Sequence, residues 1–314
     1  MIFSAESASA LSSRGEYQFP VTGSDSANVR PDAGGDWATR HVSAYELHAA
    51  DFGTSADRSW AKQDQHPYVA GEFVWTGWDY LGEPTPFYSS RSSYSGIIDL
   101  AGFKKDRFYL YQSRWRPELP MAHILPHWSW PERAGKVTPV HVFTSGDEAE
   151  LFINGKSQGR KKKAQYEYRL RWDYVVYEPG EVKVVAYKEG KQWASAITRT
   201  AGSAVGLEAT PDRAQLHADG VDLAFVTVRI TDKDGNTVPA AKQAIKFSVE
   251  GPGDIIATDN GDPTSFVPFP SHARQAFNGL CLVIVRTRAG QAGAISVRAE
   301  SPLLKGALVT VRSK

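Results

Sequence analysis

A change of pattern near residue 119 divides this 314-residue sequence into two parts of different character. In the first part, apolar runs at residues 1–5 and 69–75 alternate with helical periodicity at 55–65 and 105–115, and the run 69–75 is expected to be a buried strand. Ser55 is a suitable N-cap for the first helix, and Pro67 ends it because proline cannot continue a helix. This alternation of strands and helices predicts a parallel α/β unit.

The second part has no helical periodicity, and short strands recur in it with turn signals at intervals of about ten residues. Asn154-Gly155 is the strongest short hairpin signal, and it predicts that residues 149–153 pair with 156–159. A period-two pattern predicts one strand that presents Tyr166, Tyr168, Leu170 and Trp172 on one face. Further strands are predicted at 137–144, 182–187, 193–199, 207–209, 223–231, 245–249, 280–288, 294–299 and 307–311.

These patterns predict an α+β multidomain chain with two Ig-like β-sandwich domains after the α/β part. We expect domain boundaries at 1–118, 119–202 and 203–314, with residues 201–203 as a short linker.

Composition excludes several classes of partner. The 36 basic and 35 acidic residues nearly cancel, so a nucleic-acid or anionic-membrane partner has no electrostatic support. No run approaches the ~20 apolar residues of a membrane span. The single cysteine, Cys281, excludes an internal disulfide, and it lies in an apolar run where a buried thiol is expected.

Two residues are candidates for chemistry on sugars. Glu6 follows an apolar strand among small residues that leave room for a ligand, and a carboxylate at a strand's carboxyl end is a frequent catalytic placement. Trp75 ends the second apolar run, and a flat indole can stack on a pyranose ring. From the residues alone, a solvated glutamate and a packed tryptophan remain the alternatives.

Other polar clusters have structural explanations. Asp79, Glu83 and Asp99 are expected to be hydrogen-bond acceptors, for example toward Arg91 or Arg107. His123 and His127 are four residues apart, but Pro126 excludes the helix that would place them on one face. We therefore expect packing there, and neither a metal nor a cofactor anywhere in the chain.

Several motifs together resemble glycoside hydrolase family 2, in its bacterial β-galactosidase branch. Residues 6–15 resemble the segment of the seventh barrel strand, and 71–86, with 91–94 and 96–107, resemble the eighth strand and its loop. Residues 151–156 resemble the sandwich after the barrel, and 259–263 and 276–280 resemble the terminal Ig-like domain.

The resemblance implies that residues 1–118 are the end of a (β/α)8 TIM barrel, with Glu6 as nucleophile and Trp75 packed on the sugar. It implies a retaining hydrolase of terminal β-glycosides, a carbohydrate substrate and, as in many enzymes of this branch, export to the periplasm or medium. The family's acid/base glutamate follows the fourth strand, outside this sequence. We therefore expect the chain to need the N-terminal part of the same enzyme as its partner and to have no turnover alone.

Two other hypotheses remain open. In the first, the chain is a non-catalytic carbohydrate-binding or adhesive module that works through its sandwich domains. In the second, the two sandwiches are spacers that support the barrel. The sequence also leaves the sugar open among galactose, glucuronic acid, mannose and algal polysaccharide units.

Overall fold

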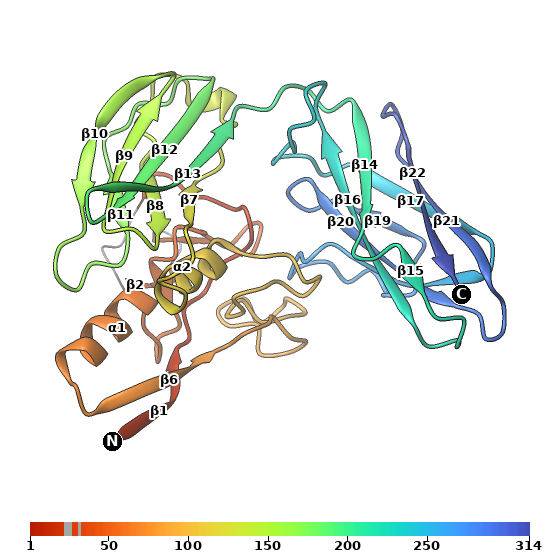
Figure 1. The fold of residues 1–314 in the computed structure, drawn as a ribbon, viewed down its shortest axis with the longest axis horizontal. Helices are drawn as coiled ribbons and strands as arrows, with labels where there is room; N and C mark the ends of the chain where they lie inside the picture. Colours follow the sequence, from red (N-terminus) through yellow and green to blue (C-terminus); the bar gives the residue numbers. More distant parts are fainter. Residues whose placement is uncertain (22–26, 31–32) are drawn as a thin grey trace. The chain divides into compact units, whose positions relative to one another are not determined.

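The computed structural model describes residues 1–21, 27–30 and 33–314. The chain divides into two compact units, Met1–Thr200 and Ala201–Lys314. Figure 1 shows both units, with labels on the elements for which there is room.

The first unit begins with a parallel pair of strands, β1 (Ile2–Ala8) and β6 (Val69–Trp75). The helix α1 (Ala56–Gln65) lies in the connection between them, and α2 (Asp106–Trp115) follows β6 after a long loop. The long connection between β1 and β6 also carries two-residue strands, namely β2 (Ala27–Asn28), β3 (Gly35–Asp36), β4 (His41–Val42) and β5 (His48–Ala49).

Both helices form where the sequence predicts them. The Ser55 hydroxyl accepts a hydrogen bond from the Arg58 backbone N–H at 3.3 Å, which caps α1 as expected. Trp60 on α1 and Leu110 and Tyr111 on α2 are fully buried, so each helix turns one side toward a core.

The rest of the first unit is a β-sandwich. One sheet has the order β10-β9-β12-β13 and the other the order β11-β8-β7. Side chains from both sheets, including Val142, Leu151 and Val184, form one core between them. The strands are β7 (Ala122–Leu125), β8 (Val140–Thr144), β9 (Glu148–Ile153), β10 (Lys156–Lys162), β11 (Leu170–Trp172), β12 (Glu181–Lys188) and β13 (Lys191–Arg199), with a 3₁₀ turn at Pro131–Arg133.

A second core in this unit crosses residue 118. Trp60 and Tyr111 belong to the same buried cluster as Leu125 and Phe143 of the sandwich. The domain boundary at 118 and 119 therefore stays a prediction.

The second unit is a separate two-sheet sandwich. Its sheets have the orders β14-β16-β20-β18 and β15-β22-β21-β17-β19, and its core includes Val226, Phe247, Val283 and Val297. Cys281 is fully buried in this core, as expected. The strands are β14 (Gly206–Pro211), β15 (Gln215–Leu216), β16 (Leu223–Thr231), β17 (Ala244–Glu250), β18 (Gly253–Asp259), β19 (Ala273–Gln275), β20 (Leu280–Thr287), β21 (Gly293–Glu300) and β22 (Ala307–Ser313).

Two local predictions are wrong. The strand predicted from Tyr166 onward begins only at Leu170, because Tyr166 has a left-handed backbone (φ 65°) and Tyr168 turns toward α1. The run 69–75 forms a strand, but its side chains are not buried as its apolar character suggests. Phe73 is 66% exposed, because no element among the described residues covers that face of the sheet.

Neither described helix has the length and apolar character needed to cross a membrane.

Candidate functional site

Glu6 and Trp75 lie at the carboxyl ends of the parallel strands β1 and β6. Ala8 is the register partner of Trp75, and Glu6 lies two residues before Ala8. A register irregularity falls between Ser4 and Ser7 of β1, so Glu6 is part of a bulged stretch. Glu6 is exposed and Trp75 is 38% exposed.

Hydrogen bonds to Glu72 define the two faces of this small sheet. The Ser7 hydroxyl donates to the Glu72 carboxylate at 2.6 Å, and Gln63 of α1 donates to the same carboxylate at 2.7 Å. Trp60 of α1 donates its indole N–H to Glu72 as well. Ser7 and Glu72 therefore point toward α1.

Successive side chains of a strand point to opposite faces. Phe73 and Trp75, which alternate with Glu72 and Val74 on β6, therefore lie on the face away from α1. Glu6 is exposed within the bulged stretch, where the alternation of β1 is interrupted. Phe3 and Phe73 on this sheet are 60% and 66% exposed. The face away from α1 thus presents Phe73 and the Trp75 indole, and the exposed Glu6 lies near the same end of the strand pair.

The loops after β1 and β6 enclose a hollow next to Trp75, which we call the aromatic hollow. Its volume is about 380 Å³, which is large enough for a small ligand. The described residues that line it are Ser9, Leu11, Ala50, Phe52, Trp75, Tyr80, Glu83, Thr85, Tyr88 and Ser95. Glu6 is not among them, so the structure does not bring the two predicted residues into one hollow.

A hydrogen-bonded chain holds one wall of the aromatic hollow. The Trp75 indole N–H donates to the Tyr80 hydroxyl at 3.1 Å, and that hydroxyl donates to the Glu83 carboxylate. Partial burial, followed by the hydrogen bond to Glu83, raises the pKa of Tyr80 to about 12. Tyr80 therefore stays protonated and keeps Glu83 beside the indole.

Sequence reasoning missed Tyr80, and it expected Glu83 to be a hydrogen-bond acceptor, which it is, although its partner is Tyr80 and not an arginine. The structure places the Glu83 carboxylate in the lining of the hollow, where it accepts from Tyr80. The run of residues 75–80, with three aromatic side chains, was the available signal, since loops rich in tryptophan and tyrosine often bind ligands.

Asp79 and Asp99 are buried acceptors, as expected, although their partners differ from the two arginines suggested by the sequence. Asp79 pairs with Lys105 at 2.5 Å, and Asp99 pairs with Arg14 at 2.6 Å. Burial raises the pKa of Asp79 to about 6, against the opposing effect of Lys105.

These buried cations connect the two loops that carry the site. Lys105 donates to the carbonyl oxygens of Ser12 and Tyr94, at 2.9 and 3.1 Å. Arg107 donates to the carbonyl oxygens of Ala10 and Ser95 and pairs with Glu46 at 2.7 Å. The loop after β1 and the loop after β6 are therefore fastened to the start of α2.

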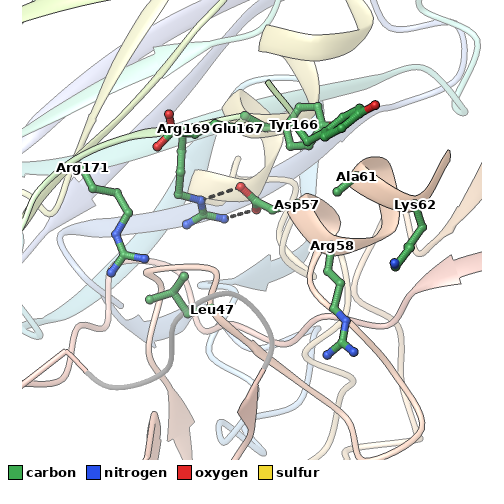
Figure 2. A pocket seen from close by; sticks show the side chains of 10 residues that line it. Leu47, Asp57, Arg58, Ala61, Lys62, Tyr166, Glu167, Arg169 and Arg171 are labelled. Atoms are coloured by element: carbon green, nitrogen blue, oxygen red, sulfur yellow. Dashed lines mark hydrogen bonds and ion pairs between the residues drawn. The ribbon is translucent and has the colours of Figure 1, made fainter. Parts of the chain in front are cut away.

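A larger hollow between α1 and residues 166–171 has a different character (Figure 2). Arg169 there pairs with Asp57 and donates to the carbonyl oxygen of Tyr45. Its guanidinium group is therefore engaged in contacts within the protein. Arg58, Lys62 and Glu167 also line it, which gives a lining of mixed charge. The aromatic hollow is the better candidate for a ligand site because it adjoins the end of β6.

The histidine pair forms no metal site. His123 stacks on Tyr109 with its Nε2 2.6 Å from Asp106, and His127 stacks on Trp130. The structure shows no group of three or more metal-ligating side chains among the residues that it describes.

Comparison with known proteins identifies two regions of the chain. The family model "Glycoside hydrolase family 2 C-terminal domain 5" matches residues 207–310, and a domain of unknown function, DUF4982, matches residues 135–194.

Curated relatives and solved structures match more of the chain. It is 40% identical to the beta-galactosidase BoGH2A of Bacteroides ovatus over 313 residues, which cover 98% of this chain and 36% of the relative. It is 34% identical over 214 residues to a putative beta-glucuronidase of Formosa agariphila, with 67% of this chain and 21% of that protein covered. A beta-glycosidase structure from Bacteroides vulgatus superposes with a TM-score of 0.87 at 28% identity, over 99% of this chain and 41% of that one. The chain thus spans about a third or less of the length of these two curated relatives.

Proposed function

The chain belongs to glycoside hydrolase family 2, and we propose that it is the C-terminal portion of a retaining glycoside hydrolase that cleaves terminal β-glycosidic bonds. In this proposal β1 and β6 are the last two strands of a (β/α)8 barrel, and residues 119–202 and 203–314 are two sandwich domains. The parallel pairing of β1 with β6, with α1 between them in sequence, supports the barrel assignment.

Glu6 is the nucleophile of the proposed reaction. Its carboxylate attacks the anomeric carbon, the glycosidic oxygen leaves with a proton from a second carboxylic acid, and water later hydrolyses the glycosyl–Glu6 ester. Trp75 provides an apolar face for the sugar ring on the same side of the sheet.

One observation carries this assignment. The Ser7–Glu72 hydrogen bond turns Ser7 toward α1, and the exposed Glu6 beside it lies at the same carboxyl end of the strand pair as Trp75, which supports the proposal that both face the sugar. Catalytic residues of β/α barrels lie at this end of the strands.

The second carboxylic acid comes from the N-terminal part of the enzyme in this proposal. Retaining hydrolysis needs two carboxyl groups about 5–5.5 Å apart. We therefore expect no turnover from this chain alone, and turnover once the N-terminal part is supplied.

The identity of the sugar is a further question. The relatives are named as a beta-galactosidase and as beta-glucuronidases. We therefore propose that the substrate is either a β-galactoside or a β-glucuronide.

Trapping tests the proposal. The chain joined to its N-terminal part is treated with 2-deoxy-2-fluoro-β-galactosyl and -glucuronosyl fluorides, and the labelled peptide is identified by mass spectrometry. We expect a glycosyl ester on Glu6, which is absent from Glu6→Gln and present in Glu118→Gln, a change at an exposed control site. A label on another carboxylate of an active enzyme would refute the role of Glu6.

A further inference from the structure

The described lining of the aromatic hollow carries a single charged side chain. Four of its described lining residues are aromatic, three are serine or threonine, and Glu83 is the only charged residue among them. A sugar in this hollow would therefore meet apolar faces, neutral hydroxyl groups and one carboxylate.

The position of Glu83 is fixed by its surroundings. Its carboxylate accepts from the Tyr80 hydroxyl, which in turn accepts from the Trp75 indole. The turn that carries it is also held, since Gly82 N–H donates to the Arg91 carbonyl oxygen and Thr85 N–H donates to the Glu83 carbonyl oxygen, both at 2.9 Å.

We infer that the aromatic hollow binds an uncharged pyranose ring and that Glu83 makes it discriminate against a uronate. This inference rests on the proposed function and narrows its substrate class. A carboxylate accepts hydrogen bonds from sugar hydroxyl groups, whereas it repels the carboxylate of a uronic acid. Glu83 is thus a specificity-determining residue.

The size of the hollow agrees with this inference. About 380 Å³ is near the lower end of the range for small-molecule sites and suits a single sugar ring. Because Tyr80 connects the indole N–H with the Glu83 carboxylate, a ring bound against that edge of Trp75 lies close to the negative charge.

Matched ligand pairs test the inference on the chain itself. Methyl β-galactopyranoside is compared with methyl β-galactopyranosiduronate, and the corresponding gluco pair is measured in parallel. Titrations follow the Trp75 indole N–H signal by NMR, assigned by its loss in Trp75→Phe. We expect the uncharged member of at least one pair to bind about tenfold more tightly at low salt.

The Glu83 variants separate charge from shape. In Glu83→Gln the preference should fall to within about twofold, whereas Glu83→Asp should retain most of it. Raising the salt concentration should reduce the preference of the unchanged chain and leave that of Glu83→Gln unaltered. Glu132→Gln, at an exposed site outside the hollow, should behave as the unchanged chain.

Three results would overturn the inference: equal binding of both members of each pair, a preference that survives in Glu83→Gln, or no change at Trp75 with any of the four ligands. None of these depends on Glu6. A fluorosugar label on Glu6 with no preference in the hollow would reject only this inference. A preference in the hollow without a label would reject only the proposed hydrolysis.

Discussion

At the scale of the residue, the loops around the aromatic hollow depend on buried charges that lie outside its lining. Lys105 is 1% exposed in its side chain and satisfies Asp79 together with two carbonyl oxygens from two different loops. Removal of one partner of a buried ion pair leaves the other charge buried without compensation. The resulting loss of stability is larger than the net stabilisation that the intact pair provides.

Lys105→Met should therefore lower the free energy of unfolding by about 3–5 kcal/mol at pH 7. Because burial already raises the pKa of Asp79 above its unfolded value, the variant can neutralise Asp79 by binding a proton. The deficit should thus be smaller at pH 5 than at pH 7. Urea denaturation at both pH values measures it.

Lys104→Met is the matched control for this change. Lys104 is the exposed neighbour of Lys105, and its ammonium lies over the Phe108 ring. We expect less than about 1 kcal/mol of destabilisation there. Equal effects from the two substitutions would show that the buried network is not what holds the loops.

A second residue-scale prediction concerns pH. His48 is 1% exposed, neither ring nitrogen has a hydrogen-bond partner among the described residues, and burial lowers its pKa to about 4. Because the unfolded chain binds a proton on this histidine near pH 6.5, stability is present above that pH and is lost as pH falls toward 4. At pH 5 the loss from His48 should be about 2 kcal/mol relative to pH 7.

The His48→Gln variant should therefore show a shallower fall in the unfolding free energy between pH 7 and pH 5. His66→Gln, at an exposed site in the same unit, should keep the slope of the unchanged chain. An unchanged slope in His48→Gln would mean that this ring titrates alike in the folded and unfolded states.

At the scale of the element, the strand pair β1–β6 is covered by α1 on one face and carries exposed apolar side chains. One face carries Glu72 and Val74 toward α1, while Phe3 and Phe73 are more than half exposed on the pair. Exposed apolar faces and unpaired strand edges promote association. This geometry agrees with a sheet that continues in the rest of the proposed barrel.

We therefore predict that the isolated chain associates in a concentration-dependent manner through this pair. The double substitution Phe3→Ser with Phe73→Ser should shift it toward the monomer in sedimentation velocity. The exposed pair Val221→Ser with Leu308→Ser in the second unit is the control. If only the control variant dissociated the chain, the β1–β6 face would not be the surface responsible.

Several elements could be predicted from local sequence because local interactions determine them. Ser55 caps α1, and Asn154 and Gly155 both adopt the positive φ values that the predicted hairpin turn requires. The Tyr166–Tyr168 segment could not be predicted, because Tyr168 is held by Trp60 and by the Asp64 carboxylate at 2.6 Å, about a hundred positions earlier.

In the candidate site, too, some residues could be predicted from local sequence and others depend on contacts formed only in the fold. Residue type and strand position suggested Glu6 and Trp75, and their roles remain predictions. Glu83 could not be placed in the aromatic hollow from sequence, because its position depends on a loop folded back against Trp75 through Tyr80.

At the scale of the whole molecule, the two units have separate cores. The buried side chains of the second unit's core lie within residues 207–311, and all strands of its two sheets lie within residues 206–313. Such a unit satisfies the usual conditions for independent folding.

Residues 201–314 alone should therefore unfold cooperatively in urea, with the β-rich circular dichroism of a sandwich. They should show no affinity for neutral polysaccharides in affinity electrophoresis, since we place sugar binding on β1, β6 and their loops. Retention by a polysaccharide would instead favour the alternative of a carbohydrate-binding module.

The most direct measurement of the central claim is a crystal structure of the chain joined to its N-terminal part and trapped with a 2-fluoroglycoside. We predict continuous density between a Glu6 carboxylate oxygen and the anomeric carbon, with the sugar ring against the Trp75 indole. A covalent sugar on any other carboxylate, or a Glu6 side chain turned away from the bound ring, would contradict the account.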